Sequence, residues 1–141
     1  MYYNSGGLKR HKSIGIPGIP ETQNAIYLAR SLLDALFYAI RRGSVGDDSK
    51  INHKKRIVYF EGLDKFDPEA EISINVVDPS VIPLEPKGGE YKIRLYSDEY
   101  QLIINMDEIK PLRVETHKAG EFFQYFKLIK DKGEFLRLKS S

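Results

Sequence analysis

The stretch that decides the expected fold is ETQNAIYLARSLLDALFYAIRR, residues 21–42. It contains no glycine or proline, while Pro20 precedes it and Gly43 follows it. Proline suits the first turn of a helix, where its missing N–H has no partner to lose, and glycine is common just after the last turn. The sequence therefore predicts one long N-terminal helix over residues 21–42.

This predicted helix is apolar on two sides. Apart from its ends only Arg30 and Asp34 are charged, and their spacing of four residues lets them pair with each other. One stripe comprises Ile26, Ala29, Leu33, Leu36 and Ile40, and the other comprises Leu28, Leu32, Ala35 and Ala39. A sheet covers one stripe only, and monomers rarely leave a large apolar patch in water. We expect a homodimer through the 21–42 helix, with internal cover by segments 14–19 or 79–86 as the alternative.

After a polar loop at 44–54, the apolar period changes to that of strands. Strands are predicted at 56–60, 71–77, 91–96, 100–106, 112–116, 122–130 and 134–139. The turn residues at 97–99 and 131–133 predict hairpins between their neighbouring strands. Segment 122–130 also fits a helical face, although its aromatic content favours a strand.

The length of 141 residues suits one domain. Glycine and proline punctuate residues 1–20, so we expect a flexible basic arm there, followed by a single domain over 21–141. The predicted fold class is α+β, with the long helix packed on a mostly antiparallel sheet or open barrel of six or seven strands. The lack of Cys and Trp and the many Lys, Glu and Ile residues are typical of a thermophile.

Composition excludes several classes of site. Without cysteine the chain has no disulfide, thiolate zinc site or cysteine nucleophile. No apolar run approaches the ~20 residues that cross a bilayer, and residues 1–12 lack the apolar stretch of a signal peptide. His11, His53 and His117 are too far apart for a recognisable metal motif. We therefore expect a cytoplasmic protein with no cofactor, no metal and no membrane partner.

Charge is distributed in blocks, although the net charge is only +2. Basic residues concentrate in 1–20, 41–60 and 110–141, and acidic residues dominate 61–109. Such blocks can form a basic patch on one face of a fold, which is how phosphate-binding surfaces are built. A solvated surface with internal ion pairs is the alternative.

The predicted strands bring aromatic and basic side chains onto shared outward faces, because strand side chains alternate. The outward positions are Lys92, Arg94, Tyr96, Phe123, Tyr125, Lys127, Phe135, Arg137 and Lys139. Further phosphate contacts would come from Lys9, Arg10 and Lys12 of the arm. Single-stranded DNA or RNA uses such a surface, since bases stack on rings and phosphates contact cations. The sequence thus predicts a non-enzymatic nucleic-acid-binding protein.

Two other functions stay open. The arm, the helix and the strand edges could contact protein, which would make the chain a structural or adaptor subunit of a larger assembly. Alternatively, Asp78 followed by Glu90-Tyr91-Lys92 resembles the PD-(D/E)xK pattern of magnesium-dependent nucleases, in which carboxylates hold the metal and the lysine positions water. In that pattern Asp78, Glu90 and Lys92 would form the site.

Overall fold

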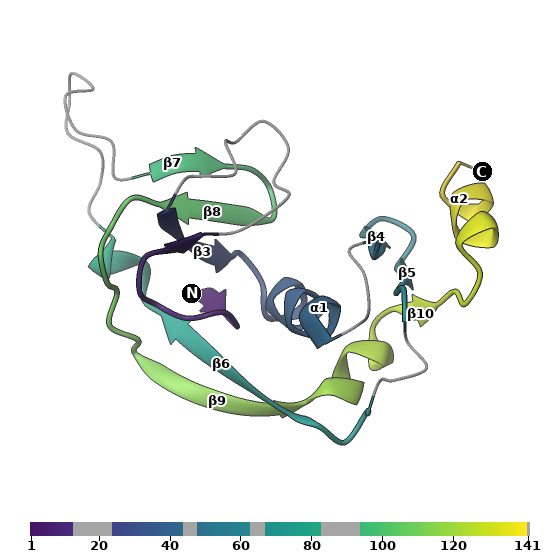
Figure 1. Ribbon diagram of the computed structural model, residues 1–141, viewed down its shortest axis with the longest axis horizontal. Helices are drawn as coiled ribbons and strands as arrows, with labels where there is room; N and C mark the ends of the chain where they lie inside the picture. The colour runs from purple at the N-terminus through teal and green to yellow at the C-terminus, as the bar shows by residue number, and fades with distance from the viewer. Residues whose placement is uncertain (13–23, 44–47, 63–66, 83–93, 141) are drawn as a thin grey trace. The chain divides into compact units, whose positions relative to one another are not determined.

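The computed structural model describes residues 1–12, 24–43, 48–62, 67–82 and 94–140 (Figure 1). The chain divides into two compact units, each built from two separate stretches. Unit 1 comprises Met1–Ala35 and Ser73–Thr116, and unit 2 comprises Leu36–Ile72 and His117–Ser141. None of the helices in these described ranges has the length and apolarity needed to cross a membrane.

Unit 1 is built on a seven-stranded sheet. Its strands are β1 (Tyr2–Asn4), β2 (His11–Lys12), β3 (Asn24–Ala29), β6 (Glu71–Val77), β7 (Arg94–Ser97), β8 (Gln101–Ile104) and β9 (Arg113–Lys118), the ends of β6 and β9 reaching into unit 2. Their order is β7-β8-β3-β1-β6-β9, and β2 pairs with β3 as well. The pairings of β1 with β3 and β6, of β2 and β8 with β3, and of β7 with β8 are antiparallel. A short 3-10 helix, η2 (Pro79–Val81), follows β6.

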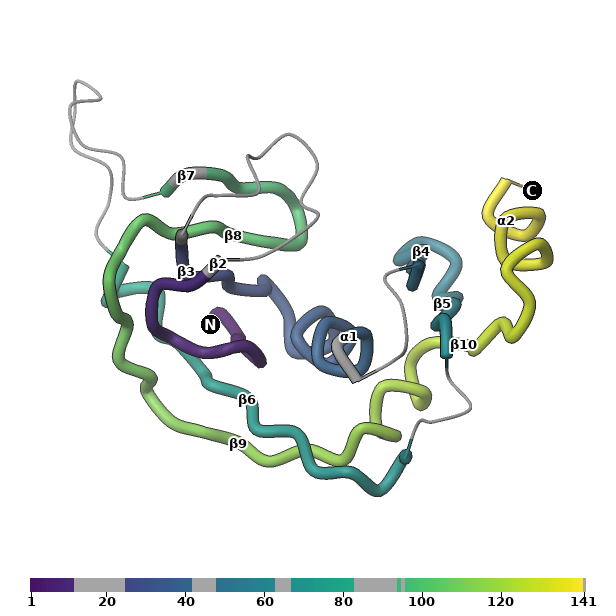
Figure 2. The backbone as a smooth tube through the Cα atoms, in the orientation of Figure 1, coloured from purple at the N-terminus to yellow at the C-terminus, as the bar shows by residue number. Residues whose placement is uncertain are grey.

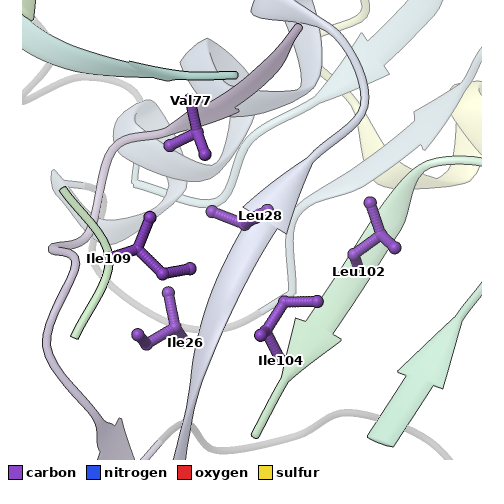
Figure 3. Close-up of a cluster of buried hydrophobic side chains, with 6 residues drawn as sticks. All are labelled: Ile26, Leu28, Val77, Leu102, Ile104 and Ile109. Carbon is purple, nitrogen blue, oxygen red and sulfur yellow. The ribbon is translucent and has the colours of Figure 1, made fainter. Parts of the chain in front are cut away.

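The core of unit 1 lies against β3 and β8 (Figure 3). Its fully or nearly buried side chains are Ile26, Leu28, Val77, Leu102, Ile104 and Ile109. One polar residue, Asn4, is buried among the central strands, where both its side-chain nitrogen and its side-chain oxygen form hydrogen bonds. Its amide donates to the Tyr27 carbonyl at 2.7 Å, and its side-chain oxygen accepts from Gly7 N–H and from the Asn75 amide. Asn4 thereby ties β1 to both of its neighbours without an unsatisfied polar group.

The helix α1 (Leu32–Gly43) begins directly after β3 and runs from unit 1 into unit 2. Ser31 marks its start, because its hydroxyl accepts a 3.1 Å hydrogen bond from Asp34 N–H and donates at 2.7 Å to the Asp34 carboxylate. This reciprocal contact satisfies a backbone donor that has no partner within the helix.

Unit 2 combines a small sheet with short helices (Figure 2). Its elements are β4 (Lys50–Asn52), β5 (Ile57–Tyr59), the 3-10 helix η3 (Ala119–Gln124), β10 (Lys127–Leu128) and α2 (Lys132–Ser140). The strand order is β10-β5-β4, with β4 antiparallel and β10 parallel to β5. Aromatic rings fill much of the interior, and Phe122 and Phe126 stack with centroids 4.8 Å apart. Ile57, Ile129 and Phe135 form a further buried cluster of unit 2.

The α+β class and the mostly antiparallel sheet are confirmed, and so are most strands of unit 1. β6 has the predicted bounds, and β7 and β8 form the predicted hairpin. β9 overlaps the strand predicted at 112–116 and ends two residues later, at Lys118. β5 confirms the strand predicted at 56–60. Among the described strands, β7 and β9 are the two edge strands of the sheet. The described residues therefore give no support for the open-barrel alternative.

The long helix predicted over residues 21–42 is wrong in its first half. Residues 24–29 form β3, which pairs with β1, β2 and β8, and the helix begins only at Leu32. A short apolar run fits a buried strand as well as a helix, and here the pairing partners decide between them. Ile26, Leu28 and Ala29 are buried in the sheet of unit 1 and belong to no exposed helical stripe. The homodimer itself stays a prediction.

The first residues also differ from the predicted arm. β1 lies between β3 and β6, and β2 pairs with β3, so residues 2–4 and 11–12 are part of the sheet. Two- and three-residue strands carry too little alternation to be recognised in a glycine-containing segment. The same limit explains β4, which occupies residues 50–52 of the predicted polar loop. The predicted boundary at residue 20 lies outside the described residues.

The predicted C-terminal hairpin is wrong. Residues 119–124 form η3, only Lys127–Leu128 is a strand, and that strand is parallel to β5. Asp131 caps a helix instead of turning a hairpin, since its carboxylate accepts a 2.8 Å hydrogen bond from Glu134 N–H at the start of α2. Phe135 and Leu138, three residues apart, then face the interior of unit 2 together.

Candidate nucleic-acid interface

The predicted face of alternating rings and cations does not form in the described C-terminal segment, because residues 119–124 and 132–140 are helical and only Lys127–Leu128 is a strand. Phe135, predicted to stack on bases, is completely buried in α2. Phe123 is half-buried, with its ring 6.0 Å from that of Phe60 and 5.5 Å from that of Phe122. Both rings therefore serve packing, and the stacking role predicted for Phe135 is wrong.

One predicted ring is open to solvent. Tyr125 follows η3 and has 57% of its surface exposed. Its neighbour Phe126 is buried. Lys127, two residues on, is exposed at the start of β10. Tyr125 and Lys127 are thus both exposed, and their joint contact with nucleic acid stays a prediction.

Most residues of unit 1 that the sequence predicts to contact nucleic acid either bind other protein groups or lie outside the described residues. The Arg10 guanidinium binds Asp107 at 3.0 Å and Asn105 at 2.7 Å, so its charge is largely neutralised. The Tyr96 hydroxyl donates to Asp98 at 3.2 Å, a hydrogen bond that raises the pKa of the phenol. Lys9 and Arg94 are exposed. The side chain of Lys12 and all of Lys92 lie outside the described residues.

A different gathering of cations exists in unit 2. The turn between β4 and β5 carries Lys54, Lys55 and Arg56, all exposed. The Lys55 amine donates a 2.6 Å hydrogen bond to the carbonyl oxygen of Leu138 in the last turn of α2. On the other side of the turn, Lys127 N–H donates to the Arg56 carbonyl at 2.8 Å. Three segments that are distant in sequence therefore converge at this turn.

Together these segments form what we term the basic cluster. Its members are Lys54, Lys55, Arg56, Lys127, Arg137 and Lys139, all exposed. Arg56 is held in a defined place, because its guanidinium lies 5.2 Å from the centroid of the Phe126 ring. Its backbone has a φ of 55°, a left-handed conformation that costs a non-glycine residue roughly 1–2 kcal/mol. The surrounding contacts hold the turn in this shape.

Asp48, a carboxylate of unit 2, is paired with cations outside the cluster. Asp48 binds Lys132 and, at 3.2 Å, Lys50, and the hydrogen bonds from Lys132 and then Lys50 lower the pKa of its carboxyl. Among the described residues, the cluster cations without an ion pair are Lys54, Arg56, Lys127, Arg137 and Lys139. An anionic ligand would therefore find these charges available.

The predicted nuclease residues are only partly described. Asp78 accepts a 2.9 Å hydrogen bond from Ser80 N–H and caps η2, and this bond lowers the pKa of its carboxyl. Glu90 and Lys92 lie outside the described residues. Within the described ranges, no group of three potential metal ligands comes together. The nuclease and the adaptor role both stay predictions.

The run Lys54-Lys55-Arg56 belongs to a basic block of the sequence, but it is not among the residues that the sequence predicts for the site. The run itself was visible as three consecutive cations before a strand. Its proximity to residues 127 and 137–139 depends on the parallel pairing of β10 with β5, which no local sequence pattern predicts. No protein-family model, curated protein or solved structure matches the chain. Function is therefore inferred from the residues themselves.

Proposed function

We propose that this protein binds single-stranded nucleic acid, without cleaving it, through the basic cluster of unit 2. The convergence of the 54–56 turn, β10 and the end of α2 carries the proposal, because it joins two of the three basic blocks of the sequence on one unit. Cations at such a site displace the counterions condensed on phosphates, which provides affinity without sequence readout.

The distribution of charge between the units supports this location. Unit 2 contains thirteen Lys and Arg against ten Asp and Glu, a formal charge of +3. Unit 1 contains nine against ten, a formal charge of −1. The excess positive charge of the chain therefore belongs to unit 2.

Tyr125 supports a preference for single strands. Its exposed ring, two residues from Lys127, offers a surface on which a base can stack while a phosphate contacts the cation. Bases within a duplex are already stacked on both faces, so only an unpaired base gains this contact. Duplex would use the phosphate contacts alone and should bind more weakly.

The test is fluorescence anisotropy with labelled single-stranded and duplex oligonucleotides of one sequence, at low and high salt, with and without Mg²⁺. We expect tighter binding of the single strand, weakening with salt, and intact oligonucleotide throughout. Arg137→Ala/Lys139→Ala should weaken binding, whereas Lys110→Ala, which removes an exposed cation of unit 1, should not. Failure to bind at low salt, or magnesium-dependent cleavage, would contradict the proposal.

A further inference from the structure

β9 is an edge of the sheet of unit 1. It lies at one end of the strand order, and within the described part of the chain its neighbour in the sheet is β6 (Figure 1). An edge strand leaves every second backbone N–H and C=O without a ladder partner, which makes it a template for another strand. Natural proteins usually protect such an edge.

Exposed apolar side chains mark this edge. Val114 of β9 has 58% of its surface exposed, and Leu112, which directly precedes the strand and donates its N–H to the Val76 carbonyl of β6, has 53% exposed. By contrast, the described side chains of α1, residues 32–41, are all buried or half-buried. Among the described residues, the two most exposed aliphatic side chains therefore lie at β9, and α1 offers no exposed apolar side chain for a dimer to bury.

The charges between these apolar positions are self-complementary. Arg113 and Glu115 lie two residues apart, so they share a face, where they pair at 2.9 Å. In an antiparallel pair of identical strands related by a two-fold axis at Val114, Arg113 of each copy lies opposite Glu115 of the other. The same register sets Val114 against Val114 and Leu112 against Thr116.

The neighbouring registers give less stable strand pairs. An axis at Arg113 or at Glu115 sets that residue against its own copy, and like charges directly opposite each other destabilise a strand pair. An axis at Thr116 places Leu112 beyond the end of the second β9. We therefore propose that two copies of this chain associate through antiparallel pairing of their β9 strands about Val114, which continues the sheet of unit 1 from one copy into the other.

Reversed charges test this interface. Sedimentation equilibrium of the wild type at micromolar concentration should give twice the chain mass of 16.2 kDa. Arg113→Glu and Glu115→Arg each set like charges opposite each other twice and should raise the dissociation constant about tenfold. A mixture of the two variants pairs two Glu with two Arg and should restore the dimer. Lys110→Glu, an exposed reversal outside β9, is the matched control and should leave the mass unchanged.

Circular dichroism of each variant separates loss of pairing from loss of folding, and recovery in the mixture excludes a misfolded component. The swap Arg113→Glu/Glu115→Arg, which restores the complementarity within one chain, should dimerise as the wild type does. A wild type of 16.2 kDa throughout the micromolar range would overturn the proposal. So would single variants that dimerise as tightly as the wild type, or a mixture that shows no recovery.

Discussion

The side-chain amine of Lys55 donates a 2.6 Å hydrogen bond to the backbone carbonyl oxygen of Leu138, 83 residues further along the chain. The last carbonyls of a helix have no intrahelical donor, and a lysine near them satisfies one while its charge opposes the negative end of the helix dipole. The contact fixes the 54–56 turn against the end of α2. The same hydrogen bond therefore stabilises the fold of unit 2 and holds together two segments of the proposed binding surface.

Replacing Lys55 with alanine should loosen the end of α2. Because the amine is exposed to solvent, we expect a small loss of about 0.3–1 kcal/mol in the free energy of unfolding. Hydrogen exchange of the amides at 136–140 should accelerate. The matched control is Lys54→Ala, which removes the neighbouring cation without removing a helix contact; equal effects of the two variants would contradict the assigned role of Lys55.

Phe135→Ala should destabilise the protein strongly. Its ring is completely buried beside Ile57 and Ile129, and removing a buried phenylalanine side chain costs about 3–5 kcal/mol. Chemical denaturation measures the change, and Leu136→Ala, at an exposed neighbouring position, should stay within about 0.5 kcal/mol of the wild type. Had Phe135 been an exposed stacking ring, the loss would appear in binding and not in stability.

Strands of unit 1 could be predicted because their alternation is local. In β6, Ile74 and Val76 are buried while Ser73 is exposed, so the pattern of the sequence matches the two faces of the strand. The hairpin of β7 and β8 could be predicted for the same reason, since its turn contains Asp98, whose carboxylate binds the N–H groups of Tyr100 and Gln101. β6 and the hairpin can therefore be predicted from their own residues alone.

β3 and α2 could not be predicted because long-range partners define them. Residues 25–29 are buried or half-buried on both faces, as suits a central strand, and this pattern cannot be told from a buried helix. Phe135 and Leu138 fit a short helical stripe, but Glu134–Lys139 alternates equally well. For the same reason the candidate site differs in part from the predicted one. Tyr125, Lys127, Arg137 and Lys139 are exposed as predicted, and tertiary contacts add the 54–56 turn to them.

Tyr125→Ala should weaken binding of single-stranded oligonucleotides by about 1–3 kcal/mol, the usual contribution of one stacked base. Stability should change little, because the side chain is 57% exposed. Tyr125→Phe keeps the ring and should bind nearly as the wild type does. If the alanine variant bound single strands normally in an anisotropy titration, the ring would have no part in the interface.

Acid should remove a contribution of Glu121 to stability. The hydrogen bond with His117, and then that from Lys118 N–H, lowers the pKa of the Glu121 carboxyl from 4.5 in the folded protein. The folded state therefore binds the proton less readily than the unfolded state, so the contribution is present above pH 4.5 and disappears as pH falls through the lowered value.

Urea denaturation of wild type and Glu121→Gln across this pH range measures the effect. The variant should be less stable above pH 4.5, and the two proteins should converge in stronger acid. A difference that does not change with pH would show that the charge of Glu121 has no role.

The salt dependence of single-strand binding tests the central claim most directly. For the wild type, the logarithm of the association constant should fall linearly with the logarithm of salt concentration, by about 0.7 for each phosphate contacted. Arg137→Ala/Lys139→Ala should bind more weakly, with a slope smaller by about 1.4 if both cations contact phosphate. An unchanged slope and affinity in this variant, or a wild type that does not bind single strands at low salt, would contradict a nucleic-acid interface on the basic cluster.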